Sequence, residues 1–172
     1  MGSRGAIIMG FFGAVFIAMT LHWQWHVSGL TLALPFIGFV VFGLAALHVM
    51  RLPGAGITLS PRAEKAITWA SAGEGIGLFL ASNLVMNLHH PEWLMPAVAL
   101  VVGLHFLPIA WAAPFPPFYV LGAALIAAAV IGVLLPAPLG GAVSGFAAAL
   151  ALWTASLVAL LRDAGVKRAA LS

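Results

Sequence analysis

Apolar residues occupy six long stretches of the chain, separated by short polar or Pro/Gly-rich segments. The stretches cover about residues 5–27, 30–50, 65–88, 92–112, 118–135 and 140–161. A helix needs about 20 apolar residues to cross the hydrocarbon core of a bilayer, and each stretch is close to that length. The pattern therefore predicts an all-α integral membrane bundle of six transmembrane helices, with residues 1–172 forming a single transmembrane domain.

Residues in and between the stretches predict where helices start and break. Ser60 followed by Pro61 is typical of a helix start, because a Ser side chain caps the first turn and Pro suits the first helical position. Pro35 and Pro96 fall inside the second and fourth stretches, where proline leaves a backbone carbonyl without its helical donor. Freed carbonyls can line a cavity, as they do in transporters with broken helices.

The composition excludes most soluble classes. Of the 172 residues, 63% are hydrophobic and only 6% are charged, whereas a soluble domain has about 25% charged residues. A cytosolic enzyme, a nucleic-acid-binding protein and a secreted module are therefore excluded. The absence of cysteine also excludes a thiolate nucleophile and a cysteine-ligated metal centre. An enzyme is not favoured, because neither a Ser-His-Asp pattern nor a phosphate-binding loop is present.

The basic residues predict an orientation. With six spans, the N-terminus, the second and fourth connections and the C-terminus share one side of the membrane. All seven lysines and arginines fall on that side: Arg4, Arg51, Arg62, Lys65, Arg162, Lys167 and Arg168. Short loops rich in Lys and Arg stay in the cytoplasm, so we expect both termini to be cytoplasmic.

Glu74 is the one charged residue predicted to lie deep in the membrane. It follows Lys65 by nine residues, or about 13 Å along a helix. A carboxylate at that depth is costly and usually marks a functional site. Gly73 and Gly77 flank it at a spacing that lets helices approach closely. The same stretch is polar on two faces, which leads us to expect that it is the central helix; its further polar residues are Ser71, Ser82, Asn83 and Asn87.

His105 is predicted to lie at a depth similar to that of Glu74, and His48 lies closer to the basic side. Pro108 frees the carbonyl of Leu104 beside the imidazole. Three interpretations stay open. Glu74 and His105 exchange a proton; or both are structural, with a protonated Glu74 hydrogen bonded to a neighbour and a neutral His105 ring bonded to a backbone carbonyl; or His48 and His105 are the axial ligands of a haem.

Four more histidines lie at the opposite boundary: His22, His26, His89 and His90. His22 and His26 are four residues apart and so share a helix face. Three or four imidazoles could bind a divalent metal such as Zn²⁺ or Cu²⁺. The alternative is that these residues are ordinary interface anchors, since Trp23, Trp25 and Trp93 accompany them.

The segment Gly103-Leu104-His105-Phe106-Leu107-Pro108, preceded by His90-Pro91-Glu92, resembles a pattern found in small bacterial polytopic membrane proteins. The resemblance covers about 20 residues and brings no activity with it. It implies only a location in a bacterial inner membrane.

Together these features favour a small permease whose polar interior centres on Glu74 and His105, with His48, Ser71, Asn83 and Asn87 nearby. A haem- or metal-binding subunit and a structural subunit of a membrane complex are the alternatives. The expected partners are the lipid bilayer, a small solute or proton, and a second copy or another membrane subunit, but not nucleic acid.

Overall fold

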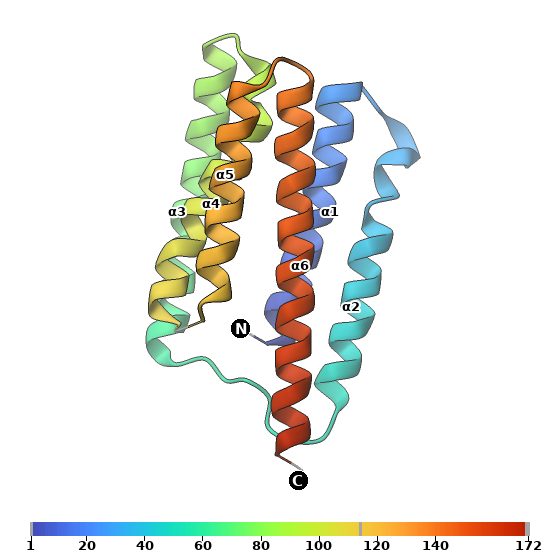
Figure 1. Ribbon diagram of the computed structural model, residues 1–172, viewed down its shortest axis with the longest axis vertical. Helices are drawn as coiled ribbons and strands as arrows, with labels where there is room; N and C mark the ends of the chain where they lie inside the picture. Colours follow the sequence, from blue (N-terminus) through green and yellow to red (C-terminus); the bar gives the residue numbers. More distant parts are fainter. Residues whose placement is uncertain (1, 114, 171–172) are drawn as a thin grey trace.

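The computed structural model describes residues 2–113 and 115–170, and within these ranges it is all-helical, with no strand (Figure 1). Six α-helices run up and down the bundle, and two short 3₁₀ helices precede α2 and α4. The elements are α1 (Ser3–Trp25), η1 (Gly29–Ala33), α2 (Phe36–Arg51), α3 (Pro61–Asn87), η2 (Pro91–Trp93), α4 (Leu94–Ala112), α5 (Pro117–Leu134) and α6 (Leu139–Ala169).

Five segments are long and apolar enough to cross a membrane. They are Ser3–Trp25, Gly29–Arg51, Pro91–Ala112, Pro117–Leu134 and Leu139–Ala169. Many of their large apolar side chains are exposed, as expected for a protein whose solvent is lipid. α3 has 27 residues but is not one of the five, because polar residues interrupt its apolar pattern. The helical, apolar fold is compatible with a polytopic membrane protein.

The centre of the bundle is formed by α1, α4, α5 and α6. α6 packs against α1, α5 and α4, whereas α2 packs against α1 and α6, and α3 packs mainly against α4. Our prediction that the third helix is central is wrong. Only Ala63 and Val85 of α3 are buried, and α3 stands at the edge of the bundle beside α4 (Figure 1).

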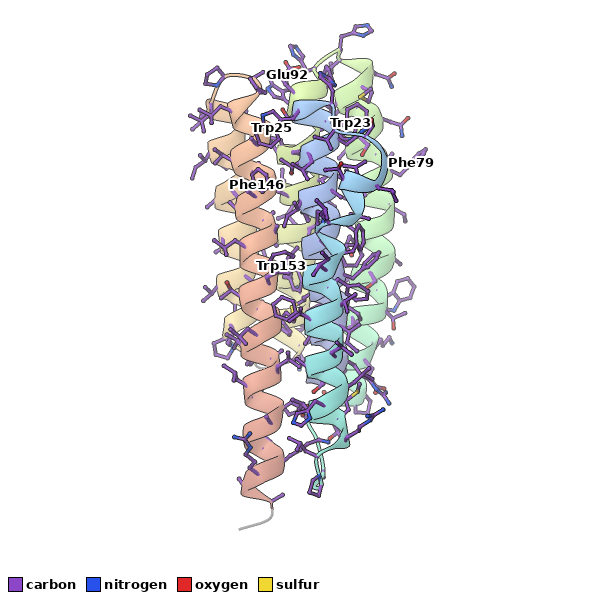
Figure 2. All side chains as sticks on the ribbon, turned by 90° about the vertical axis from the view of Figure 1, so that its right-hand side faces the viewer. Trp23, Trp25, Phe79, Glu92, Phe146 and Trp153 are labelled. Atoms are coloured by element: carbon purple, nitrogen blue, oxygen red, sulfur yellow. The ribbon has the colours of Figure 1, made fainter. Side chains whose placement is uncertain are left out.

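Small residues explain why α1 and α6 are central. A side chain at Gly13 of α1 would collide with the indole ring of Trp153 on α6. Nε1 of that indole donates a hydrogen bond to the carbonyl oxygen of Gly10 at 3.0 Å, and the Ser156 hydroxyl donates one to the carbonyl oxygen of Ala6 at 2.8 Å. Figure 2 shows Trp153 about half-way along the bundle, so these bonds hold the two helices together within the apolar region.

The helix boundaries confirm some sequence predictions and correct others. The Ser60 side chain accepts a hydrogen bond from the Ala63 N–H at 3.2 Å, so Ser60 caps α3 as predicted. Pro35 stands between η1 and α2, where the second stretch breaks. Pro96 does not break its helix, because it lies in the first turn of α4, where its missing N–H is not needed.

α6 continues past residue 161, where the last apolar stretch ends, to Ala169. Its 31 residues span about 46 Å, which exceeds the hydrocarbon thickness of about 30 Å. Hydropathy marked the apolar part of this helix, but residues 162–169 contain no proline, and the helix continues through Gly165.

All seven basic residues lie at one end of the bundle, which we call the basic end. The start of α1, the 52–60 connection, the α4–α5 connection and the end of α6 meet there (Figure 1). Hydrogen bonds from Ser3 and Ile57 to Asp163 and the contact of Arg162 with Phe115 join these segments. Trp23, Trp25 and Glu92 mark the opposite end (Figure 2).

Candidate functional site

Glu74 and His105 face each other across the interface between α3 and α4. Glu74 Oε2 lies 3.5 Å from His105 Nδ1, and the side chains are only 14% and 10% exposed. Similar depths had predicted that these two residues could pair, and the structure places them together. When one of the two groups is protonated and the other is not, a carboxyl and an imidazole at this separation can exchange the proton.

The pair is in contact but is not tightly hydrogen bonded. His105 Nδ1 is buried and has no hydrogen-bond partner among the described residues, since the geometry to Glu74 does not meet the criteria of a hydrogen bond. The imidazole also makes an edge contact with the ring of the next residue, Phe106, with 5.1 Å between centroids. An unpaired polar atom in an apolar interior is costly, and in native proteins such atoms often belong to functional sites.

α4 is held in place by close contact with α5. A Cβ on Gly103 would lie 3.0 Å from the carbonyl oxygen of Gly122, and a Cβ on Gly122 would lie 3.0 Å from that of Gly103. The two backbones therefore touch two residues before His105. α4 also continues through Pro108 without ending, so the His105 side chain is presented by an unbroken helix.

The glycines beside Glu74 play different roles. A Cβ on Gly77 would lie 3.0 Å from Val101 Cγ1 of α4, so the absence of a side chain allows α3 to approach. Gly73 and Gly75 have no atom within 4 Å of such a Cβ. Of the predicted Gly73/Gly77 pair, only Gly77 lies at the helix contact, and the other two glycines leave space around the Glu74 backbone.

Two hollows flank Glu74 along α3. A cavity of about 550 Å³ at the basic end reaches Ile8 on α1 and Ile67 on α3. A second one, of about 160 Å³, begins at Phe12 and Leu78 and includes Ser82. Glu74 lies seven residues beyond Ile67 and four before Leu78, which corresponds to about 10 Å and 6 Å along the helix. Along α3, Glu74 thus lies between the two hollows, although it lines neither of them.

The other predicted polar residues lie away from the pair. Ser71, Asn83 and Asn87 are exposed on the outside of α3, and Asn83 Nδ2 donates a hydrogen bond to the carbonyl oxygen of Phe79 at 2.7 Å. His48 is exposed on α2, which packs against α1 and α6, whereas His105 faces α3. The structure therefore pairs His105 with Glu74 and not with His48.

The four histidines at the opposite end do not form a common cluster. His22 Nδ1 lies 3.1 Å from the carbonyl oxygen of Val27, and His90 Nδ1 lies 2.8 Å from Glu92 Oε1. His26 and His89 adopt left-handed backbone conformations, with φ of 53° and 58°, just beyond the ends of α1 and α3. Within residues 2–113 and 115–170, no group of three or more His, Asp or Glu side chains is arranged to hold a metal ion.

The most completely bonded charged group is one that the sequence interpretation missed. Asp163 is 4% exposed, and its carboxylate accepts hydrogen bonds from the Ser3 N–H and hydroxyl and from the Ile57 N–H. Lys167, one turn later, donates to the carbonyl oxygens of Met50 and Leu52 at 2.9 and 3.0 Å. These two α6 residues join the N-terminus, the end of α2 and the 52–60 connection.

The sequence contained a weak signal for this cluster. Asp163 and Lys167 share a helix face at i and i+4, but charges at the end of a transmembrane helix usually face water. Gly56 fits the cluster, since a Cβ there would lie 3.1 Å from both Asp163 Oδ1 and Lys167 Cε.

Comparison of the chain with protein-family models, with curated protein sequences and with solved structures finds no significant match.

Proposed function

We propose that this chain is a small multi-pass permease of a bacterial inner membrane, and that Glu74 and His105 form its proton-exchanging site. The observation that carries the proposal is the 3.5 Å separation of Glu74 Oε2 and His105 Nδ1 in the middle of α3 and α4. With one exchangeable proton between them, the pair carries no net charge, whether it is a neutral carboxyl beside a neutral imidazole or a carboxylate beside an imidazolium. Gain or loss of a proton then changes the charge of the site by one unit at a depth where charge is costly.

The hollows on either side of Glu74 support a transport role. Each ends within about two turns of the carboxyl, one towards the basic end and one towards the opposite half of the bundle. The basic-end cavity includes charged side chains, with Arg4 and Glu64 among its lining residues. The smaller hollow is lined by apolar side chains apart from Ser82. A small movement of α3, which is packed mainly against α4, would connect the carboxyl with either one.

The orientation proposed here places the basic end in the cytoplasm, because short segments rich in Lys and Arg are retained there. The chain has no cysteine, so single-cysteine variants give an unambiguous test. In intact cells, a membrane-impermeant maleimide should label His89→Cys but should label Gly165→Cys only after permeabilisation. The reverse pattern would overturn the orientation.

The transport proposal is tested by proton flux into liposomes that contain the purified protein and a pH-sensitive dye. Under an imposed membrane potential, the parent protein should acidify the lumen faster than empty liposomes do. Glu74→Gln and His105→Gln should reduce the rate of acidification to that of empty liposomes, since a glutamine side chain does not titrate. Glu92→Gln, at a partly exposed acid that pairs with His90 at the opposite end, is the matched control and should keep the parent rate. A Glu74→Gln protein with the parent rate would reject the proposal.

A second candidate, a subunit of a larger membrane complex, is favoured by the outer face of α3. This face carries Ser71 and Asn83 in a region that lipid would otherwise contact. Polar side chains there are stabilised when a neighbouring helix covers them. Cross-linking of an Asn83→Cys variant in native membranes tests this function, because a helix seated on α3 should give a defined cross-linked product.

A further inference from the structure

We propose that the groove between α5 and α6 holds an acyl chain of an anionic phospholipid, with the lipid phosphate beside Arg162. The proposal is independent of any transport function. It rests on the shape and composition of the groove, on the position of Arg162 at its end, and on the absence, among residues 2–113 and 115–170, of a carboxylate partner for that side chain.

The groove has a volume of about 610 Å³, and of the side chains that line it only Thr154 is polar. Alanines on both helices leave the space, among them Ala124 on α5 and Ala147 and Ala151 on α6. From Ala147 to Val158 the groove follows α6 for about 16 Å, or about half the hydrocarbon thickness. This length matches the acyl chain of one leaflet.

The groove opens sideways into the apolar belt of the protein. Val120 and Leu150 line it and are 70% and 67% exposed. An occupant that enters here comes from the membrane, so the groove selects hydrocarbon and not a water-soluble ligand.

Arg162 supplies the charge at the basic end of the groove. It follows Val158 by one helical turn, and its Cζ lies 4.3 Å from the ring centroid of Phe115, the residue before Pro116 of the groove wall. Arg162 is exposed and forms no salt bridge with any carboxylate of the described residues. Its N–H donors are therefore free for a phosphate, which guanidinium groups bind in bidentate fashion.

A second, smaller hollow extends the site beyond the groove. It has a volume of about 210 Å³ and is lined by Arg162 and Phe115 together with Thr58 and Ser60 of the 52–60 connection. The hydroxyls of these two residues can donate to the polar head of the same lipid. An apolar groove, a cation and hydroxyls thus adjoin one another at the basic end, and these are the groups that the acyl chain and the polar head of a phospholipid require.

The test is native mass spectrometry of the purified protein with phosphatidylglycerol and with phosphatidylcholine of the same acyl chains. We expect one phosphatidylglycerol to be retained with about a tenfold preference, or about 1.4 kcal/mol. Arg162→Gln should remove the preference, whereas Arg168→Gln, an exposed arginine at the same end, should keep it. Ala124→Phe, at an exposed position of the groove wall, should fold normally and lose retention of both lipids.

Equal retention of the two lipids by the parent protein would overturn the proposal, as would an Arg162→Gln variant that behaves like Arg168→Gln. A lipid-free dimer that Ala124→Phe converts to a monomer would show that a second copy fills the groove instead. In each case the proton-flux assay is unaffected, so failure of the lipid site is distinguishable from failure of the permease proposal.

Discussion

Asp163 and Glu74 are both shielded from solvent, but their surroundings differ. The Asp163 carboxylate accepts three hydrogen bonds, and the neighbouring Lys167 ammonium donates two to backbone carbonyls. Glu74 accepts no hydrogen bond within the described part of the chain and has only the His105 ring at 3.5 Å. A fully bonded polar cluster fixes one arrangement of the chain, whereas a loosely bonded pair can change its protonation at little structural cost. We therefore propose that the first region stabilises the fold and that the second carries the proton exchange.

Removal of the Asp163 carboxylate should have the largest effect on stability. Asp163→Ala leaves the buried N–H of Ser3 and the partly buried N–H of Ile57 without an acceptor, and we expect a loss of about 3 kcal/mol in unfolding free energy. Thermal unfolding in detergent measures it. Glu64→Ala, an exposed acid whose carboxylate makes no hydrogen bond among the described residues, is the control and should change stability by less than about 0.5 kcal/mol. Equal melting temperatures for the two variants would contradict a structural role for Asp163.

Lys167→Met should lower the free energy of unfolding by about 2 kcal/mol. The Met side chain keeps the apolar stem but cannot donate to the carbonyl oxygens of Met50 and Leu52. Arg168→Met removes the exposed charge next to it and should be nearly neutral. Limited proteolysis within the 52–60 connection gives a second readout, since release of the end of α2 should make this connection more accessible. A Lys167→Met protein as resistant as the parent would argue against the cluster as a clamp.

Gly103→Ala tests whether the contact of α4 with α5 positions His105 beside Glu74. The new methyl group would meet the Gly122 carbonyl oxygen at 3.0 Å and Ile126 Cγ1 at 2.9 Å, so α4 and α5 must separate. We expect a loss of about 1.5 kcal/mol and a reduced proton flux, because His105 moves with α4. Gly73→Ala, which meets no atom within 4 Å, should retain the flux and the stability of the parent. Similar behaviour of the two variants would show that the contact of α4 with α5 does not position His105.

Glu74→Gln should have the smallest effect on stability and the largest effect on flux. The amide retains the shape of the carboxyl, and no hydrogen bond among the described residues depends on its charge, so we expect a change below about 0.5 kcal/mol. Thermal unfolding and proton flux measured on the same preparation separate the two roles. A strongly destabilised Glu74→Gln protein would mean that the pair holds α3 to α4, as Asp163 holds the basic end together.

The sequence by itself determined the apolar segments and much about the ends of the helices. Hydropathy predicted the helical membrane fold, and local rules predicted the cap at Ser60 and the break at Pro35. Counting residues from Lys65 also placed Glu74 at about the depth of His105. These properties depend on the free energy of transferring each segment into lipid and on local backbone chemistry, both of which can be read along the chain.

Only the tertiary structure decided which helices are neighbours and how each is rotated about its axis. It placed α3 at the edge of the bundle, turned His105 towards Glu74 and not towards His48, and gave Asp163 its partners 160 and 106 residues away. Lipid is as apolar as the helix surfaces, so hydropathy does not distinguish a lipid-facing side from a buried one. The choice is made by steric fit between distant residues, such as Gly13 with Trp153 and Gly103 with Gly122.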